Sequence, residues 1–585
     1  MRNQDIARIF TEIADMLEIK DENPFRVRAY RRAAMAIGGF PRDASGMSRE
    51  ELRKIPGIGE DLAMKIREIA DTGTCKFYDD LKKKSPAGLT QLLTIPGLGP
   101  KTAKFLYSEF NVRTVEELEK LVREHRLKGL RGFKEKSERN ILRGIELMKK
   151  GTDRVPLGRI LPVAQRLMEG LREKKAPVKN LAIAGSLRRW KETIRDIDLL
   201  ATSADPAKVM EVFTGLPEVK QVLAKGGTKT TVILEEGIQA DLRVVEEDSF
   251  GAALCYFTGS KEHNIRLREM AVKRGLKINE YGVFDQNGKK TGGKREEDVY
   301  NILGLPFIPP EMREDSGEIE AALEGRLPRV VQLSDIRGDL HVHSKWSDGG
   351  HTFEELADTA IKHGYSYLAV TDHSKGLGIA RGLTVERMLE EIKLLDALNR
   401  KLKGTVRILK GVEVDIRSDY TLDFPDELLA RLDVVNASIH TGFRQSSAQI
   451  TKRIVSAMRN PFVNIISHPT GRLIGEREAY ELDMDDVFRE AKETGTALEI
   501  NSFPARLDLN DSMARRAKEK GISIAISTDA HLLSHFDYMA YGVATARRAW
   551  LEPGEVINTM GVEELLKTLR KKRMVLAGTG PAPEN

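Results

Sequence analysis

The chain has 585 residues, of which 31% are charged and 41% are hydrophobic, and its formal net charge is +6 at pH 7. It contains no run of 18 or more apolar residues and its N-terminus lacks the short apolar core of a signal peptide, so we expect a soluble, cytoplasmic protein without a membrane span. Cys75 and Cys255 lie far apart and outside any Cys-x-x-Cys motif, which predicts buried thiols rather than disulfides or a zinc knuckle.

The charge is unevenly distributed. Residues 1–335 carry 60 Lys and Arg against 52 Asp and Glu, whereas residues 336–585 carry 34 against 36. The excess is concentrated in residues 101–195. A local excess of positive charge favours a polyanionic partner, although solvated Lys-rich helices are an alternative explanation.

Residues 1–82 are predicted to be helical, because apolar side chains recur there at helical spacing. A short motif then occurs twice: residues 54–59 read KIPGIG and residues 94–99 read TIPGLG, each followed by an amphipathic segment. In such a hairpin the N–H groups at the start of the second helix can hold a phosphate without reading bases. We therefore predict non-specific binding to the DNA backbone, with a purely architectural turn as the alternative. The residues concerned are Gly57, Gly59, Gly97, Gly99 and Lys101.

A weaker third copy of the motif lies at residues 127–132 and precedes a predicted basic helix at residues 134–150. After it, residues 151–250 alternate between strand and helix signals. The predicted helices are 160–171 and 209–213, and the predicted strands are 181–184, 196–201, 230–234 and 238–245.

Within this region an apolar run closes on Gly185-Ser186, and a second run carries Asp196 and Asp198 at alternate positions. On a strand this alternation places both carboxylates on one face, and Asp241 adds a third from another predicted strand. A charged edge strand would be the simplest explanation, but the surrounding residues are too apolar for an edge. Three carboxylates beside a Gly-Ser turn and two arginines are instead typical of two-metal phosphoryl transfer.

Residues 253–260 read ALCYFTGS, in which two aromatic side chains precede a glycine turn, and a basic helix is predicted over residues 264–274. The aromatic pair either stacks on a sugar or fills a core, and composition does not decide between the two. Residues 306–335 contain four prolines and a predicted acidic helix at 311–324, which indicates a tether between two halves.

Up to about residue 305, the order of these motifs resembles the family X DNA polymerases, the group that contains polymerase beta. The resemblance implies a multidomain α+β and α/β chain with a helix-hairpin-helix region, a nucleotidyltransferase palm and a small thumb. The corresponding boundaries are 1–82 for a DNA-binding and lyase-like domain, 83–150 for the second hairpin, 151–248 for the palm, 249–305 for the thumb and 306–335 for the linker.

The same resemblance implies roles for individual residues. Asp196, Asp198 and Asp241 would hold two Mg²⁺ or Mn²⁺ ions, and Asp241 would activate the primer 3′-hydroxyl. Arg268 would contact the template. The residues implied for nucleotide binding are Gly185, Ser186, Arg189, Arg154, Tyr256, Phe257, Gly259 and Asn264. The implied partners are gapped or primer-template DNA and deoxynucleoside triphosphates, bound by a nucleoid-associated monomer.

Two positions depart from the family pattern. Lys65 matches the family's Schiff-base lysine, which removes 5′-deoxyribose phosphate, but Asp61 stands four residues before it where vertebrate members carry a lysine. A carboxylate at that position favours the charged amine, which is not a nucleophile. Gln239 stands where a basic residue two positions before the third aspartate is expected.

From residue 336 onward, short apolar runs repeatedly end in His, Asp or Glu, with helical segments such as 353–363, 385–403 and 483–494 between them. This is the pattern of a β/α barrel with functional groups at the carboxyl ends of its strands. More than half of the eleven histidines fall at such ends, whereas a single histidine there would be only a solvated strand end. Imidazole together with carboxylate suits Zn²⁺, Mn²⁺ or Fe²⁺.

Residues 336–575 resemble the PHP domain, a distorted β/α barrel with metal-dependent phosphoesterase activity. The resemblance implies up to three Zn²⁺ or Mn²⁺ ions, with Glu413 bridging two of them. The nine implied ligands fall into three groups: His341, His343 and Asp529; His440 and His468; and Asp348, His373 and His531, with Glu413 shared.

Together these features predict a DNA polymerase that fills short gaps in DNA repair and carries a metal-dependent 3′–5′ exonuclease, with cleavage at abasic sites as a further activity. Two alternatives are a phosphoesterase whose N-terminal half only binds DNA, and a repair scaffold without catalysis that is built on the helical hairpins.

Overall fold

The computed structural model describes residues 3–20, 22–38, 44–53, 58–84, 100–124, 154–376, 380–474 and 477–576, with a few isolated positions between residues 55 and 145. The chain forms two compact units. The first comprises Met1–Arg154 with Ser260–Arg266 and Glu314–Gly317, and the second comprises Val155–Gly259, Leu267–Arg313 and Glu318–Asn585.

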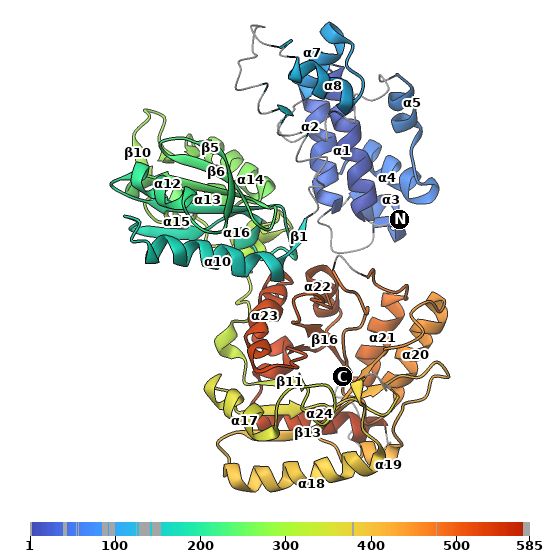
Figure 1. Ribbon diagram of the computed structural model, residues 1–585. Helices are drawn as coiled ribbons and strands as arrows, with labels where there is room; N and C mark the ends of the chain where they lie inside the picture. Colours follow the sequence, from blue (N-terminus) through green and yellow to red (C-terminus); the bar gives the residue numbers. More distant parts are fainter. Residues whose placement is uncertain are drawn as a thin grey trace. The chain divides into compact units, whose positions relative to one another are not determined.

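The first unit is helical, as predicted for residues 1–82 (Figure 1). Its core contains the periodic apolar residues of the first helix, including Ile6, Phe10 and Ile13, all fully buried. A second small core forms around the later helices. The helices are α1 (Asn3–Ile19), α2 (Pro24–Gly38), α3 (Arg49–Arg53), α4 (Glu60–Thr72), α5 (Lys76–Lys84), α7 (Pro100–Phe110) and α8 (Val115–Arg123).

The hairpin motifs are described only in part. Gly59 is the N-cap of α4, where its backbone is extended (φ −86°, ψ 178°) and no side chain caps the helix. A Cβ atom at Gly59 would meet open space, so the start of α4 is accessible to a ligand. The described residues do not include Gly57, Gly97 or Gly99, the third copy apart from Leu127, most of the basic segment 134–150, or the side chain of Lys101.

The second unit begins with a five-stranded sheet in the order β2-β4-β7-β6-β5. Strands β4 and β7 are parallel, and their neighbours are antiparallel. The strands are β2 (Asn180–Ile183), β4 (Asp196–Thr202), β5 (Val219–Lys225), β6 (Lys229–Leu234) and β7 (Gln239–Val245), and the helices α10 (Leu157–Glu173) and α12 (Pro206–Thr214) contribute to the same core. The four predicted strands are confirmed. Strand β5 was not predicted, because most of its residues are exposed and its sequence does not alternate between apolar and polar side chains.

A three-stranded antiparallel sheet follows, in the order β10-β9-β8. Its strands are β8 (Lys277–Asn279), β9 (Gly282–Phe284) and β10 (Lys290–Gly292), and the helices of this region are α13 (Phe250–Thr258), α14 (Lys261–Lys273) and α15 (Glu296–Ile302). The aromatic pair of the YFTG motif ends α13. Gly259 follows with φ +68° and ψ −156°, a conformation that only glycine adopts readily.

Parts of the segment predicted as a tether are packed into hydrophobic cores. Its acidic helix is shorter than expected, because the segment breaks into the 3₁₀ turn η3 (Pro310–Met312) and the helix α16 (Glu318–Leu323). Ile308, Met312 and Ile319 are buried in one core together with Trp550, and Val331 is buried in the core of the next domain. The prolines therefore set turns in a fixed connection rather than a free spacer.

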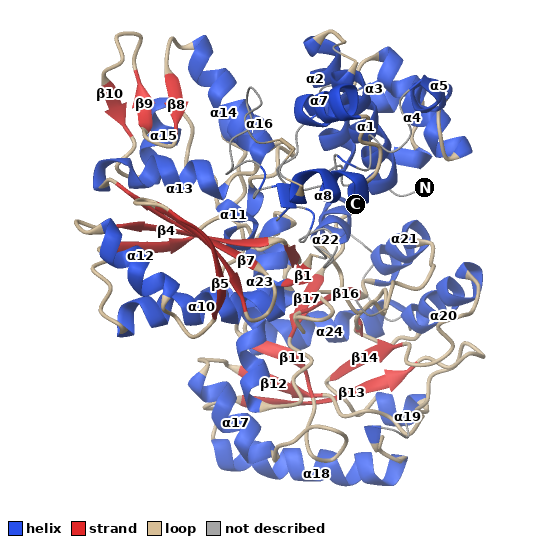
Figure 2. Cartoon of the chain, turned by 45° about the horizontal axis from the view of Figure 1, so that its top comes forward, coloured by secondary structure: helices blue, strands red, loops and turns tan. Residues whose placement is uncertain are grey.

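The C-terminal part is a barrel of seven parallel strands in chain order, β11 to β17 (Figure 2). The residues after β17 return to β11, where the His343 N–H donates to the Ala530 carbonyl at 2.9 Å and nearly closes the ring. The strands are β11 (Gly338–Val342), β12 (Tyr367–Val370), β13 (Arg407–Asp415), β14 (Val434–Ser438), β15 (Ile465–Ile466), β16 (Ala497–Asn501) and β17 (Ile524–Ser527). The predicted distorted β/α barrel is confirmed.

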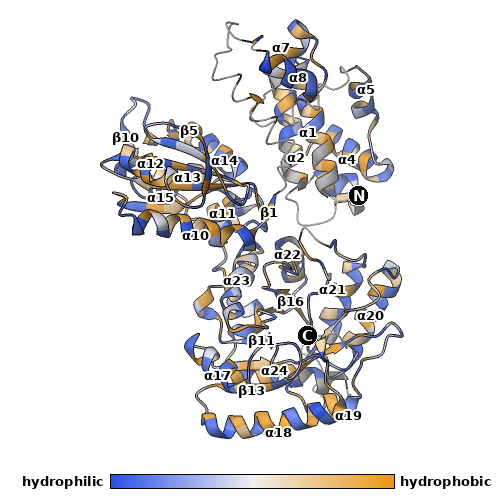
Figure 3. Cartoon of the chain, viewed as in Figure 1, coloured by the Kyte–Doolittle hydropathy of each residue, from blue (hydrophilic) through white to orange (hydrophobic). Residues whose placement is uncertain are grey.

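Amphipathic helices cover the barrel. In α18, hydrophobic and hydrophilic residues alternate along the helix (Figure 3), and Met388, Ile392 and Leu395 are its buried apolar face. The barrel helices are α17 (Phe353–Lys362), α18 (Val385–Leu402), α19 (Asp426–Leu429), α20 (Ser447–Arg459), α21 (Met484–Thr494), α22 (Asp511–Glu519), α23 (Met539–Arg548) and α24 (Val562–Leu576).

Both cysteines are buried free thiols, as predicted. Within the described ranges, no helix is long and apolar enough to cross a membrane. The last helix, α24, brings one cation into the interior: Lys572 is 6% exposed and donates to the Val463 carbonyl and, at 2.7 Å, to Thr496 Oγ1. Burial lowers the pKa of Lys572 to about 7, although Glu490 opposes the shift.

This burial makes a prediction for Lys572→Met. Between about pH 7 and the usual lysine pKa, the unfolded chain binds one more proton than the folded chain, so the free energy of unfolding of the wild type should rise with pH, by at most about 1.4 kcal/mol per unit. The variant lacks this contribution. Urea unfolding of both proteins at about pH 7 and pH 9.5 measures their free energies of unfolding. The wild-type value minus the variant value should be larger at the higher pH. The same value at both pH values would contradict a neutral buried Lys572.

Candidate active sites

The nine predicted barrel ligands lie at or beyond the carboxyl ends of the strands. His341 and His343 belong to β11 and its end, Glu413 belongs to β13, and Asp529 follows β17. Most are strongly buried, whereas the side chains of Asp348 and His531 are 31% and 30% exposed and open the site to solvent. Because the strands are parallel, residues far apart in sequence meet at one end of the barrel.

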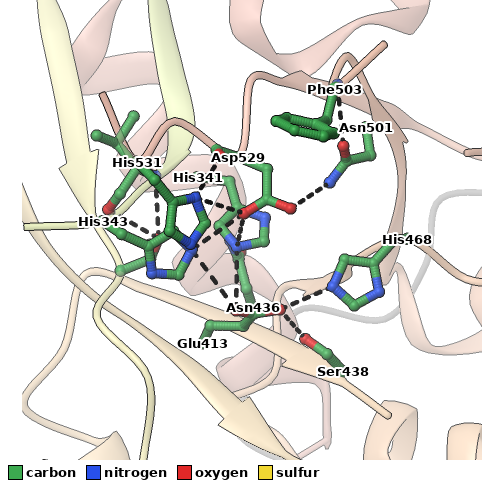
Figure 4. A network of polar contacts seen from close by, with 12 residues as sticks. His341, His343, Glu413, Asn436, Ser438, His468, Asn501, Phe503, Asp529 and His531 are labelled. Atoms are coloured by element: carbon green, nitrogen blue, oxygen red, sulfur yellow. Dashed lines mark hydrogen bonds and ion pairs between the residues drawn. The ribbon is translucent and has the colours of Figure 1, made fainter. Parts of the chain in front are cut away.

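Glu413 is the centre of the cluster (Figure 4). Its Oε1 lies 2.9 Å from His468 Nε2 and 3.2 Å from His440 Nε2. Its Oε2 lies 2.9 Å from His373 Nδ1 and 3.3 Å from His341 Nε2. His343 Nε2 lies 3.6 Å from the same Oε2, so one buried carboxylate faces five imidazoles.

The remaining ligands lie beside this centre. His343 Nε2 is 3.1 Å from Asp529 Oδ1, and its ring stacks on those of His373 and His531 with centroids 4.4 Å and 4.3 Å apart. Asp348 reaches His531 Nε2 at 3.4 Å and His373 Nε2 at 3.6 Å. The predicted third group is therefore assembled.

Several polar residues that the sequence did not single out orient these ligands. Glu499 on β16 lies 2.8 Å from His341 Nδ1 and accepts the His468 N–H at 2.7 Å. Asn501 donates to Asp529 Oδ2 at 3.1 Å, and Ser438 donates to Glu413. Strand β16 was missed, although Ala497–Asn501 alternates apolar and polar residues, and that alternation was the available signal.

The charges of the cluster are strongly coupled. Burial opposes the charged form of His373, but Glu413 and Asp348 raise its pKa to about 10. Burial and the neighbouring His531 and His373 lower the pKa of His343 to about 3. Burial alone would raise the pKa of Glu413, yet the surrounding imidazoles hold it well below its usual range. The site thus holds ionised carboxylates in the interior and needs positive charge to balance them.

The cluster fits divalent metal ions. Within the described part of the chain, His341 Nε2, His343 Nδ1 and His440 Nδ1 are buried nitrogens without a hydrogen-bond partner. Three groups bring ligand atoms within 4.8 Å of one another: His343, Asp348, His373 and His531; His341, His343 and Asp529; and His373, Glu413 and His440. These groups differ from the predicted division in two respects: His373 takes the place beside Glu413 and His440 that was predicted for His468, and His343 also joins the third group.

The second candidate site lies on the five-stranded sheet. Asp198 on β4 pairs in register with Asp241 on β7, and Asp196 lies two residues from Asp198 on the same face. Burial, followed by the Asp196 carboxylate, raises the pKa of Asp198 to about 6. The sheet therefore concentrates three carboxylates, as the sequence predicted.

Cations accompany these carboxylates. Lys229 Nζ lies 2.9 Å from Asp241 Oδ2, and Arg243 Nη1 lies 3.2 Å from the same oxygen and 3.6 Å from Asp198 Oδ1. Gln239 donates to Asp241 Oδ1 at 3.2 Å. In contrast to the barrel, the described residues of this sheet do not bring three ligand atoms within 4.8 Å of one another.

A short helix, α11 (Gly185–Arg188), starts beside these carboxylates. Gly185 has φ +65°, and a Cβ atom there would lie 2.5 Å from Asp198 Oδ2, so glycine is needed for the close approach. Arg188 binds Glu296 with two hydrogen bonds of 2.7 and 2.6 Å, and Arg189 donates to the Thr258 carbonyl. The arginines thereby connect α11 to the YFTG turn.

Comparisons with known proteins agree with this arrangement. Residues 1–75 match the helix-hairpin-helix domain, residues 89–146 the SAM-like helix-hairpin-helix tandem, residues 253–314 the DNA polymerase beta thumb and residues 339–503 the PHP domain. The chain is 42% identical over 574 residues to the DNA polymerase/3′-5′ exonuclease PolX of Bacillus subtilis, covering 98% of this chain and 100% of that protein.

The chain belongs to the family X DNA polymerases that carry a PHP domain. It is also 26% identical to rat DNA polymerase lambda over 50% of this chain and 52% of that protein, and 32% identical to a probable phosphatase of Thermoanaerobacter over 41% of this chain and 97% of that protein. The predicted family, fold class and enzyme class are therefore confirmed. We refer below to the five-stranded sheet as the palm, following the predicted boundaries, and to the barrel, which contains the residues that match the PHP domain, as the PHP barrel.

The other predicted residues of the polymerase half are placed as follows. Tyr256 and Phe257 are half-buried with ring centroids 5.2 Å apart, and Arg243 lies over the Phe257 ring at 4.5 Å. Arg268 is exposed on α14. Arg154 and Asn264 belong to the first unit, so their distances from the palm carboxylates are not part of the described arrangement. Their predicted roles stay predictions.

Lys65, the predicted lyase residue, lies on α4 with a side chain that is only 12% exposed. It contacts Asp61, as the departure from the family pattern suggested, and its Nζ lies 5.2 Å from the centre of the Phe77 ring. The lyase activity of Lys65 stays a prediction.

We predict that Glu499→Gln lowers metal affinity and exonuclease rate by about 10- to 100-fold, because loss of a carboxylate that orients a ligand has effects of that size. Primer extension should be unchanged, since Glu499 does not contact the palm. Metal content after dialysis and 3′–5′ degradation of a labelled strand measure the two effects, with Glu563→Gln on the surface of α24 as the control. Wild-type metal affinity in Glu499→Gln would refute the role of Glu499.

Gly185→Ala should reduce primer extension about tenfold or more, because the new methyl group meets Asp198 and a positive φ costs an L-residue about 1–2 kcal/mol. The exonuclease should be unaffected. Gly227→Ala is the matched control, since a Cβ atom there meets open space. Equal extension rates for the two alanine variants would show that the close approach of Gly185 to Asp198 is unimportant.

Proposed function

We propose that this chain fills short gaps in DNA with its palm and degrades DNA from 3′ ends with its PHP barrel. Support for the first activity comes from the in-register pairing of Asp198 with Asp241 beside the Gly185 turn. Support for the second comes from the cluster that Glu413 forms with the eight other predicted ligands, which is the observation that carries the proposal. The Bacillus subtilis relative bears a name that combines the same two activities.

In the palm, Asp196, Asp198 and Asp241 would hold two Mg²⁺ or Mn²⁺ ions, which supply charge stabilisation for phosphoryl transfer. Asp241 is the group proposed to accept the proton of the primer 3′-hydroxyl. Its hydrogen bonds from Gln239 and Arg243 orient its carboxylate.

On the nucleotide side, Ser186 and Arg189 are proposed to bind the triphosphate, together with Arg154. The YFTG turn is proposed to face the sugar, because Gly259 permits close backbone approach and Arg189 ties the turn to α11. Asn264 and Arg268 are proposed to contact the DNA.

In the barrel, Zn²⁺ or Mn²⁺ ions would supply a water of lowered pKa and a clamp on the phosphodiester. The chain's own residues orient this site: Glu499 fixes the ring of His341, Asn501 fixes Asp529, and Ser438 fixes Glu413. The partly exposed Asp348 and His531 form the open side, where a DNA 3′ end would enter. Cleavage at abasic sites is proposed as a second reaction of this site.

The two activities should be separable by mutation. Asp198→Ala should abolish gap filling and leave the exonuclease intact, because Asp198 belongs only to the palm. The double variant His341→Ala, Asp529→Ala should do the reverse. A gapped duplex with Mg²⁺ or Mn²⁺, with and without deoxynucleoside triphosphates, measures both. Wild-type extension by Asp198→Ala would refute the palm assignment, and undiminished metal-dependent degradation by the double variant would refute the barrel assignment.

A further inference from the structure

The turn that follows α11 lies against the PHP barrel within the second unit. Arg548, the last residue of α23, donates to the Arg189 carbonyl oxygen at 2.8 Å. Arg472, in the loop after β15, donates to Glu192 Oε2 at 2.8 Å. Between these two contacts, Trp190 packs edge-to-face on Tyr541 of α23, with ring centroids 5.6 Å apart. Barrel residues thus contact the palm turn at three points.

Both arginines are held firmly by the barrel itself. Arg548 has a side chain that is 5% exposed, pairs with Asp511 on α22 at 2.7 Å and reaches the Glu311 carbonyl at 3.4 Å. Arg472 has a side chain that is 14% exposed and donates to the carbonyl oxygens of residues 506 and 507 at 2.9 and 2.5 Å. A donor fixed in this way loses little conformational freedom when it binds the palm.

Apolar packing surrounds these polar contacts. Leu507 and Tyr541 of the barrel are buried in the same core as the palm sheet. A Cβ atom at Gly158 on α10 would lie 2.2 Å from Cβ of Pro504, so the palm helix and the loop after β16 are in direct contact. Figures 1 and 2 both show α10 beside α23. The contact is packed like a protein interior rather than like a transient surface.

The palm turn has an unfavourable backbone conformation. Trp190 has φ +54°, a region that bulky L-residues rarely adopt. Such a conformation persists only where neighbouring contacts stabilise it. The Arg548 hydrogen bond to the preceding carbonyl and the Tyr541 ring contact are contacts of this kind, and both come from the barrel.

We propose that Arg548 and Arg472 of the PHP barrel are positioning residues for the polymerase. They hold the backbone of residues 189–192, and so keep Ser186 and Arg189 in place for the triphosphate. The proposal rests on the proposed nucleotide-binding role of α11. It assigns to the PHP domain a function in nucleotide binding that is separate from its own metal-dependent chemistry.

The first test compares Arg548→Ala with Arg547→Ala. Arg547 is the matched control, because it lies on the same helix but contacts Glu311 and the Val331 carbonyl instead of the palm turn. Arg548→Ala should raise KM for the deoxynucleoside triphosphate about tenfold, with kcat and KM for gapped DNA little changed, as expected for the loss of a buried charged donor. Arg547→Ala should leave all three near their wild-type values.

The exonuclease activity of each preparation shows that the barrel is folded. Arg548→Lys gives a further distinction, since lysine keeps the charge pair with Asp511 but is too short to reach the Arg189 carbonyl as well. Arg548→Lys should therefore remain defective in KM. A wild-type KM for the nucleotide in Arg548→Lys would show that only domain packing matters and would overturn the proposal. So would a rise in KM in Arg547→Ala as large as that in Arg548→Ala.

A double-mutant cycle tests the second contact from the palm side. Glu192→Ala and Arg472→Ala should each raise KM for the nucleotide, and their combination should be no worse than the worse single variant, because both remove one interaction. If the rise in KM in the double variant were the product of the two single rises, or if KM did not change, coupling through this pair would be contradicted. A wild-type protein that does not extend primers would refute the proposed function itself, whereas normal extension with unchanged KM in these variants refutes only the positioning role.

Discussion

The structure depends on one electrostatic problem, which is the burial of Glu413 at the end of the barrel. A carboxylate that is 1% exposed is stable only when positive charge compensates it, and five imidazoles converge on its two oxygens. These imidazoles come from four different strands or strand ends, so the barrel must close for the charge to be balanced. Glu499, Asn501 and Ser438 then fix the rings and carboxylates from behind. Fold and metal chemistry are thus two aspects of the same arrangement.

In the palm, the charge of the carboxylates is balanced by lysine and arginine rather than by imidazoles. Its three carboxylates lie on two neighbouring parallel strands, and Lys229 and Arg243 lie beside them. The Lys229 side chain that pairs with Asp241 is 50% exposed, whereas the imidazoles around Glu413 are largely buried and oriented by neighbouring polar groups. The barrel cluster is therefore preorganised for its ions to a greater degree than the palm.

Much of this arrangement follows from sequence, because period-two alternation and strand-end ligands are local patterns. The palm strands around Asp198 and Asp241 and the Gly185 turn were predicted in this way, whereas the set of nine barrel ligands was implied by the resemblance to the PHP domain. The contact of Lys229 with Asp241 was not predicted, because it depends on how β6 pairs with β7, and local sequence patterns do not give strand pairing. Glu499 was missed with its strand. The proline-rich segment was taken as a tether because proline content does not reveal that Ile308 and Met312 are buried.

That connecting segment has a consequence for how the two enzymes are joined. It contributes to the thumb core on one side and to the barrel core on the other, and Trp550 from the barrel completes the thumb core. A truncated chain that ended within this segment would expose apolar residues that are buried in the full-length protein. In this chain the palm and thumb are therefore joined to the barrel by shared apolar packing as well as by the polypeptide itself.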